Sequence, residues 1–103
     1  MEDDVVLSHT AALILATVSA GGRYGFDIMD LTGLPSGTVY PALRRLERAS
    51  LLESHWEKEK LAFAEQRPAR KYYRLTRRGA AVVAKAVERF PLLSHIQAGA
   101  KSR

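Results

Sequence analysis

The stretch GLPSGTVYPALRRLERA, residues 33–49, decides the fold of this chain. Its opening glycine and proline favour a turn that ends one helix and separates it from the next. Ser36 is placed to cap the new helix, which we expect to run to about Ala49. Pro41 lies little more than one turn in and lacks a backbone N–H, so an irregular or tight helix start is expected.

This helix is predicted to have one buried stripe and one exposed basic face. The stripe follows from spacings of four and three residues between Val39, Leu43 and Leu46. At 100° per residue the outward positions are then Gly37, Pro41, Arg44 and Arg48, with Thr38 and Arg45 on the flank. Arginine suits guanine edges and phosphates because its planar fork donates two parallel hydrogen bonds. The alternative is a solvated helix face whose arginines serve solubility alone.

Two helices are expected upstream of this one. Residues 7–20 are apolar on nearly all sides, so that helix must be covered on more than one face. Residues 24–31 can form a short second helix before the turn at Thr32–Pro35. Two helices joined by a tight turn are typical of a helix-turn-helix.

A β-hairpin is expected downstream. Residues 52–58 alternate in part and residues 70–75 are strand-like, whereas 59–69 are polar and predict a loop at the tip. Trp56 is expected in the core under the hairpin, and so is Tyr73. The order helix, helix, helix, hairpin, helix is the layout of a winged helix.

The returning arm of this hairpin is strongly basic and contains no acidic residue. Its six cations are Arg67, Arg70, Lys71, Arg74, Arg77 and Arg78. They would repel one another without a polyanion nearby, which favours nucleic acid as the partner. An ordinary basic strand is the alternative. Tyr72, which lies among these cations, is a candidate to donate its hydroxyl to a phosphate.

The last predicted helix is capped by Thr76 and is amphipathic. Its apolar stripe is Val82, Val83, Ala86, Val87 and Phe90, and Pro91 is expected to kink or end it. Such a stripe is too large to leave wet on so small a domain, so it predicts a two-fold interface. We therefore divide the chain into a winged helix-turn-helix at 1–76 and a dimerisation helix at 77–98.

Composition narrows the function further. The chain has 103 residues, which predicts one domain, and a formal net charge of +5, which favours a polyanionic partner. It has no cysteine, so thiolate catalysis and cysteine-bound zinc are excluded. The three histidines, His9, His55 and His95, fall on different predicted elements, so no metal site and no cofactor are expected.

A membrane protein and an enzyme are both disfavoured. The residues before Val5 are acidic, unlike a signal peptide, and the best apolar run, 11–18, is far shorter than the ~20 residues of a membrane span. No serine, threonine or histidine has a base and an orienting acid at a suitable spacing. We expect a cytoplasmic, non-enzymatic protein with no catalytic residues.

Three segments together resemble the PadR family of bacterial transcription regulators. They are Gly33–Glu47, the run Arg70–Thr76, and Tyr24–Ile28, which is similar to the start of that family's second helix. The resemblance covers roughly residues 7–90. It implies a winged-helix fold, a homodimer built through the first and last helices, and repression by occupying a promoter. The short C-terminal part resembles the small subgroup with one helix after the wing.

The predicted DNA-binding residues are Ser36, Gly37, Thr38, Tyr40, Pro41, Arg44, Arg45, Arg48, Arg67, Arg70 and Lys71. The predicted dimer residues are Leu7, Ala11, Val83, Val87 and Phe90.

We expect double-stranded DNA with an inverted-repeat operator as the partner, and a small aromatic effector that binds where the dimer helices meet. The resemblance does not extend to drug binding through a tryptophan on the last helix, because the only tryptophan is Trp56. A protein-binding winged helix and a non-specific architectural DNA binder remain alternatives.

Overall fold

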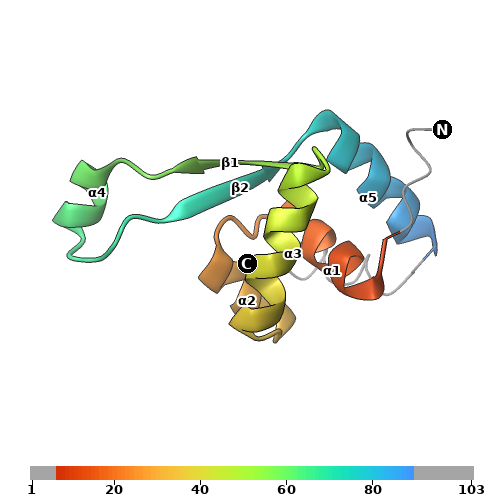
Figure 1. The fold of residues 1–103 in the computed structure, drawn as a ribbon, viewed down its shortest axis with the longest axis horizontal. Helices are drawn as coiled ribbons and strands as arrows, with labels where there is room; N and C mark the ends of the chain where they lie inside the picture. The colour runs from red at the N-terminus through yellow and green to blue at the C-terminus, as the bar shows by residue number, and fades with distance from the viewer. Residues whose placement is uncertain (1–6, 90–103) are drawn as a thin grey trace.

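The computed structural model describes residues 7–89 as a helical body with a long hairpin (Figure 1). The elements in order are α1 (His9–Ser19), α2 (Gly25–Thr32), α3 (Ser36–Arg48), β1 (Leu52–Trp56), α4 (Glu59–Ala64), β2 (Lys71–Leu75) and α5 (Arg77–Arg89). The predicted class, mainly α with a β-hairpin in a winged-helix order, is confirmed. Phe90 and the kink expected at Pro91 lie outside the described residues, and the domain boundary stays a prediction.

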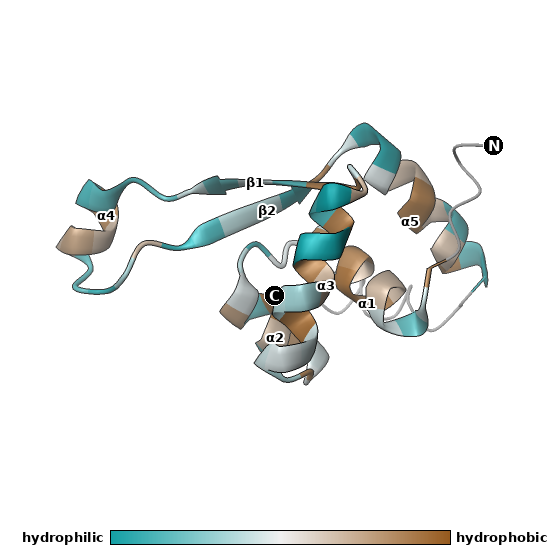
Figure 2. Cartoon of the chain, viewed as in Figure 1, coloured by the Kyte–Doolittle hydropathy of each residue, from teal (hydrophilic) through white to brown (hydrophobic). Residues whose placement is uncertain are grey.

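Helix α1 forms the centre of the core. Ile14, Leu15 and Ala16 on it have no exposed surface, because α2, α3, α5 and β2 all pack against it. Figure 2 shows hydrophobic residues on α1 and on the helices beside it. The apolar sequence of this helix on nearly all sides is therefore explained by cover from its own chain. Within the described range, no helix is long and apolar enough to cross a lipid bilayer.

The apolar stripe of α5 also has a partner within the chain. Val82 and Val83 are each only 4% exposed and join the main core, while Ala86 packs on Ala12 and Ala16 of α1. The premise that this stripe needs a second subunit for cover is therefore wrong. Val87, at the outer edge of α5, is only half-buried.

The turn between α2 and α3 has the conformation expected from its glycine. Gly33 adopts a left-handed φ of 75° and its N–H donates to the carbonyl of Met29 at 2.8 Å, which ends α2. The predicted cap of α3 is wrong by one residue. Pro35 is the N-cap, since its carbonyl accepts from the N–H groups of Thr38 and Val39, both at 3.0 Å. The first of these bonds is the tight start that was expected, and the helix continues through Pro41.

The wing is an antiparallel pair in which Leu52 lies opposite Leu75 and Trp56 opposite Lys71. Its second strand has an additional contact with the body, where the N–H of Tyr73 donates to the carbonyl of Arg23 at 2.7 Å. This hydrogen bond joins the base of the wing to the segment between α1 and α2. Beyond that base the hairpin projects away from the body (Figure 1).

Two predictions for the wing are wrong. The tip is not a loop, because it contains α4, whose Leu61–Ala64 run consists mainly of good helix formers that follow an acidic first turn. Trp56 is not core, since its side chain is 65% exposed. Leu52 shares its strand face and is buried, but Trp56 lies four residues further along, where the hairpin has left the core and an open groove separates it from Tyr24 and Tyr40.

The first turn of α5 is locked to the chain that leaves α3. The Thr76 hydroxyl accepts from the N–H of Gly79 at 2.9 Å, as predicted for a cap, and also donates to the carbonyl of Ser50 at 2.7 Å. The N–H of Thr76 donates to the carbonyl of Leu51 at 3.2 Å. Gly79 lies directly against Leu51, so that a Cβ at this position would overlap the Leu51 carbonyl oxygen.

We expect Gly79→Ala to lower the free energy of unfolding by about 1–3 kcal/mol, since the added methyl group overlaps backbone that cannot rotate away. Urea denaturation followed by circular dichroism measures this. Gly37→Ala is the matched control, because it lies in α3 with no atom within 4 Å of the new Cβ. The control should be neutral or stabilising by up to about 1 kcal/mol. Equal unfolding midpoints for the two variants would contradict the close contact at Gly79.

Candidate nucleic-acid interface

The exposed face of α3 carries three arginines. Arg44, Arg45 and Arg48 are all exposed, whereas Val39, Leu43 and Leu46 are buried, as the periodicity predicted. At the start of the helix Ser36 and Gly37 are exposed, and Thr38, Tyr40 and Pro41 are half-buried. The structure therefore gathers eight of the predicted DNA-binding residues on one helix.

Glu47 joins this helix to the wing. Its carboxylate accepts a hydrogen bond from the Ser54 hydroxyl at 2.5 Å and lies 3.7 Å from the Lys71 ammonium. Lys71 also lies 5.8 Å from the ring centres of both Trp56 and Tyr73. The hydrogen bond between Ser54 and Glu47 ties the hairpin to α3, so the two elements present their cations side by side.

A groove of about 320 Å³ separates the wing from the start of α2 and from α3. It brings together four of the predicted DNA-binding residues from distant parts of the chain, namely Tyr40, Arg67, Arg70 and Lys71. Arg70 stacks over the ring of Tyr24, with its guanidinium carbon 4.3 Å from the ring centre. A cationic, aromatic-lined groove of this kind can follow a phosphate backbone and pack against its sugars.

The groove also contains residues that sequence analysis missed. Phe26 is 72% exposed and lines it together with Trp56 and Tyr24. Gly25 lies so close to the ring of Tyr40 that a Cβ there would overlap it, so the glycine leaves space for that ring. No local pattern in the sequence separates these exposed aromatic residues from core ones, because their exposure depends on where the hairpin leaves the body.

The basic arm of the wing is less free than its sequence indicated. The antiparallel register places Glu53 of β1 opposite Arg74, and the two side chains pair at 2.5 Å. Arg67 binds Glu57, and Arg78 donates to the carbonyl of Ala49 at 2.6 Å. The repulsion expected among the six cations is therefore reduced by contacts within the chain, so the basic arm does not by itself require a polyanion.

Glu57 holds the outer end of the wing together. Arg67 donates to its two oxygens at 2.5 and 2.8 Å, while the Arg70 N–H and the Tyr72 hydroxyl donate to it at 3.3 and 3.2 Å. The hydrogen bond from Arg67 is the main reason why the pKa of Glu57 falls from 4.5 to about 2, against the opposing effect of burial. The Tyr72 hydroxyl is thus engaged with a carboxylate, although it was a candidate for phosphate.

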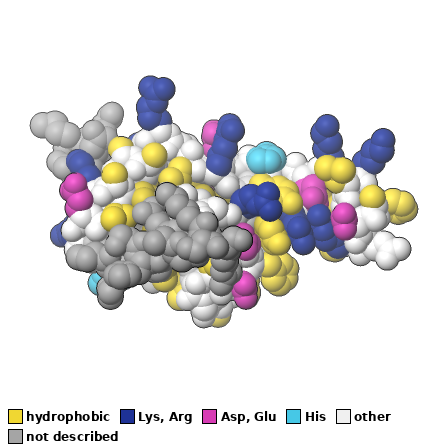
Figure 3. All heavy atoms as spheres, turned by 180° about the vertical axis from the view of Figure 1, so that it is seen from behind, with side chains coloured by type: hydrophobic (Ala, Val, Ile, Leu, Met, Phe, Trp, Pro, Cys, Tyr) yellow, Lys and Arg dark blue, Asp and Glu magenta, His cyan; other side chains and the backbone are white. Residues whose placement is uncertain are grey.

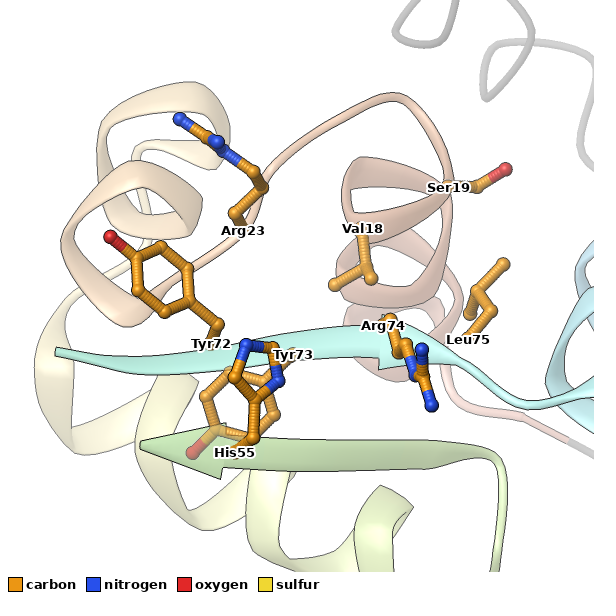
Figure 4. Close-up of a pocket in the computed structure, with 8 residues that line it drawn as sticks. All are labelled: Val18, Ser19, Arg23, His55, Tyr72, Tyr73, Arg74 and Leu75. Carbon is orange, nitrogen blue, oxygen red and sulfur yellow. The ribbon is translucent and has the colours of Figure 1, made fainter. Parts of the chain in front are cut away.

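A second groove, of about 570 Å³, lies where the hairpin passes the end of α1 and Arg23 (Figure 4). The Tyr72 ring lies between His55, stacked at 5.7 Å, and Arg23, whose guanidinium is 5.9 Å from the ring centre. Val18, Ser19 and Arg74 complete its wall. It contains none of the predicted DNA-binding residues, which lie on α3 and in the first groove.

Comparison with known proteins agrees with this geometry. The model of the transcriptional regulator PadR-like family matches residues 14–85, which is more than half of the chain. The chain belongs to the PadR-like family. The crystal structure of a PadR family transcription regulator from hypervirulent Clostridium difficile is similar over 89% of this chain and 97% of that one, with a TM-score of 0.71 and 24% identity.

A second similar fold is a transcriptional regulator from Clostridium thermocellum, with a TM-score of 0.63 and 24% identity over 88% of this chain and 94% of that one. Among curated protein sequences, none is significantly similar. As a PadR-like protein the chain is a DNA-binding transcription regulator, and the family consists of regulators rather than enzymes. The predicted family and fold are therefore confirmed.

For this PadR-like protein we expect Glu57→Gln to loosen the tip of the wing, because the Arg67 fork loses its charged acceptor. Since the pKa of Glu57 is lowered on folding, the ion pair should be intact above about pH 4.5 and be lost as the pH falls toward 2. The fluorescence of Trp56, the only tryptophan and the neighbour of Glu57, measures this change.

The matched control is Glu59→Gln, which removes an exposed carboxylate on α4. It should leave the Trp56 acid transition in place, whereas Glu57→Gln should show the loosened signal already at neutral pH. Far-ultraviolet circular dichroism separates this local change from acid unfolding of the body. Identical titrations for wild type and Glu57→Gln would exclude Glu57 as the residue that holds the tip.

Proposed function

We propose that this protein is a homodimeric repressor that binds an inverted-repeat operator, with α3 in the major groove and the wing against the adjoining backbone. The observation that carries the proposal is the set of exposed arginines Arg44, Arg45 and Arg48 on α3. They lie beside a groove that also contains Arg70 and Lys71. In helix-turn-helix proteins the second helix of the motif enters the major groove, and α3 occupies that position in the chain.

The proposal divides the work between α3 and the wing. Arg44 and Arg45 read base edges, while Ser36, Gly37 and Thr38 bring the start of the helix close to the DNA backbone. Arg70 and Lys71 contact phosphates, because base contacts specify sequence and phosphate contacts position the protein. Arg67 has the fork of its guanidinium on Glu57, so its role is to hold the wing in position.

We expect Arg44→Ala to weaken binding to specific DNA by about 1–3 kcal/mol and to relax one base-pair position. Lys71→Ala should weaken all DNA about equally and reduce the salt slope of log K by about one unit. The specific probe is the duplex that wild-type protein selects from random-sequence DNA, and the comparison is its scrambled form. Fluorescence anisotropy at several salt concentrations gives both quantities.

Each outcome of this experiment has a distinct meaning. Equal losses on both duplexes for Arg44→Ala would remove this residue from base reading. A loss confined to the selected duplex for Lys71→Ala would mean that the wing reads sequence. Wild-type protein that binds every duplex equally would be an architectural binder, and protein that binds none would be an interaction module with the same fold.

The dimer part of the proposal rests on the edge where α1 and α5 meet. Leu7, Ala11 and Val87 are half-buried and pack against the core, and Leu7 and Val87 also pack on the small residues through which the two helices approach. A two-fold contact there would place two copies of α3 about 34 Å apart, one turn of DNA, which gives half-sites about ten base pairs apart. We include a planar aromatic effector that binds at this edge and tilts the two DNA-binding heads.

We expect wild-type protein to sediment as a dimer at micromolar concentration and Val87→Glu to sediment as a monomer, because a buried charge at the contact costs several kcal/mol. Ala84→Glu is the matched control, since Ala84 is exposed on the same helix. Val87 also touches the core, so Ala11→Glu provides a second variant, and circular dichroism shows which variants stay folded. Sedimentation of the wild type as one chain would overturn the dimer.

A further inference from the structure

The tip of the wing presents large apolar side chains to solvent. Phe63 is 86% exposed and Leu61 is 56% exposed, although both lie on α4 next to Ala62, which is only 3% exposed. Figure 3 shows hydrophobic side chains gathered at this end of the molecule beside Lys and Arg side chains. Exposed Phe and Leu lower solubility, and a polar turn would close a hairpin more simply.

The outward surface of α4 is apolar with a single cation. At 100° per residue Lys60 and Ala64 lie opposite the buried Ala62, flanked by Leu61 and Phe63. The acidic residues Glu59 and Glu65 are displaced toward the buried side. Any partner that approaches the end of the wing therefore meets Phe63, Leu61 and one positive charge before it meets a carboxylate.

This surface is held outward rather than left to collapse. The Arg67 guanidinium is held by Glu57, and the backbone N–H of Arg67 donates to the carbonyl of Ala62 at 3.1 Å. This second bond closes the end of α4. An open hollow of about 490 Å³ beside Phe63, lined also by Lys60 and Ala69, leaves this ring without a packed neighbour on that side. The tip is thus a supported apolar projection.

The reach of the wing indicates which partner fits this projection. The body contact of β1 at Ser54 lies three residues before Glu57, which corresponds to about 10 Å of strand. Helix α4 lies across the end of the hairpin (Figure 1), and the width of a helix with its side chains adds about 10 Å more. Neighbouring major and minor grooves are separated by half a turn of DNA, roughly 17 Å. With α3 in a major groove, α4 therefore meets the next minor groove, and the basic groove of the interface leads to it.

We propose that Phe63 is a minor-groove wedge that enters between two base pairs and kinks the operator, with Lys60 on the adjoining phosphate. Apolar side chains that unstack a base step from the minor-groove side bend DNA in this way, and Phe is among the residues that do so. The inference rests on the proposed function and extends it, because it makes the wing a device that deforms DNA as well as one that binds it.

The test is the bend angle of the DNA duplex that wild-type protein selects from random-sequence DNA, measured by energy transfer between dyes at its two ends. Saturating protein is used, so that weaker binding cannot imitate a smaller bend. Wild type should bend the duplex. Phe63→Ala should lose most of the bend and bind roughly tenfold more weakly, whereas Phe63→Leu should retain part of both.

Glu65→Ala is the matched control, because it truncates an exposed side chain at the end of α4, on the side away from Phe63, and should leave the bend unchanged. Thermal unfolding should be the same for Phe63→Ala and Glu65→Ala, since neither side chain is buried. An unchanged bend with Phe63→Ala on a duplex that is still bound would overturn the wedge and leave the proposed function standing. A change in the sedimentation of DNA-free protein with an unchanged bend would assign the tip to contact with protein. If wild type selects no duplex, the wedge and the proposed function both fail.

Discussion

The close approach of Gly79 to Leu51 is the constraint on which the rest of the structure depends. The chain leaves α3 at this point, travels out along the wing and returns to the same place, where Thr76 bonds to Ser50, Leu51 and Gly79. Two segments far apart in sequence are thereby fixed at one crossing. The direction of the wing and the start of α5 both follow from it, and so does the placement of the cations relative to α3.

Electrostatics then sorts the cations of this PadR-like protein into two sets. Arg74 is paired with Glu53 of β1 and Arg67 with Glu57 just beyond that strand, and Lys71 lies near Glu47 at a longer distance. The α3 arginines project into solvent, and Arg70 rests on an aromatic ring. Short, bidentate pairing of Arg67 fixes the hairpin, whereas loosely held or stacked cations can exchange their contacts for phosphate. Surface ion pairs contribute little to stability, so this division serves geometry more than folding energy.

The sequence alone predicted the buried face of α3 and the turn before it, but it did not predict which side chains of the wing are exposed or paired. The spacing of Val39, Leu43 and Leu46 identified the buried face of α3, and Gly33 marked the turn before it, because both signals are local. The exposure of Trp56 and the pairing of Arg67 with Glu57 depend on register and on how far the hairpin projects. Those are properties of tertiary structure. The same limit explains the α5 stripe, whose cover by α1 could not be inferred from either helix alone.

Glu57 has a consequence for how such proteins can diversify. At the outer end of the wing one carboxylate ties the outgoing strand to the returning strand. The segment of residues 58–66, which contains α4, can therefore differ in sequence and length between related proteins. A different helix, a short turn or a longer loop could replace this segment without disturbing the core, as long as the Glu57–Arg67 ion pair is kept. The specificity of the wing and the stability of the fold can thus change independently of each other.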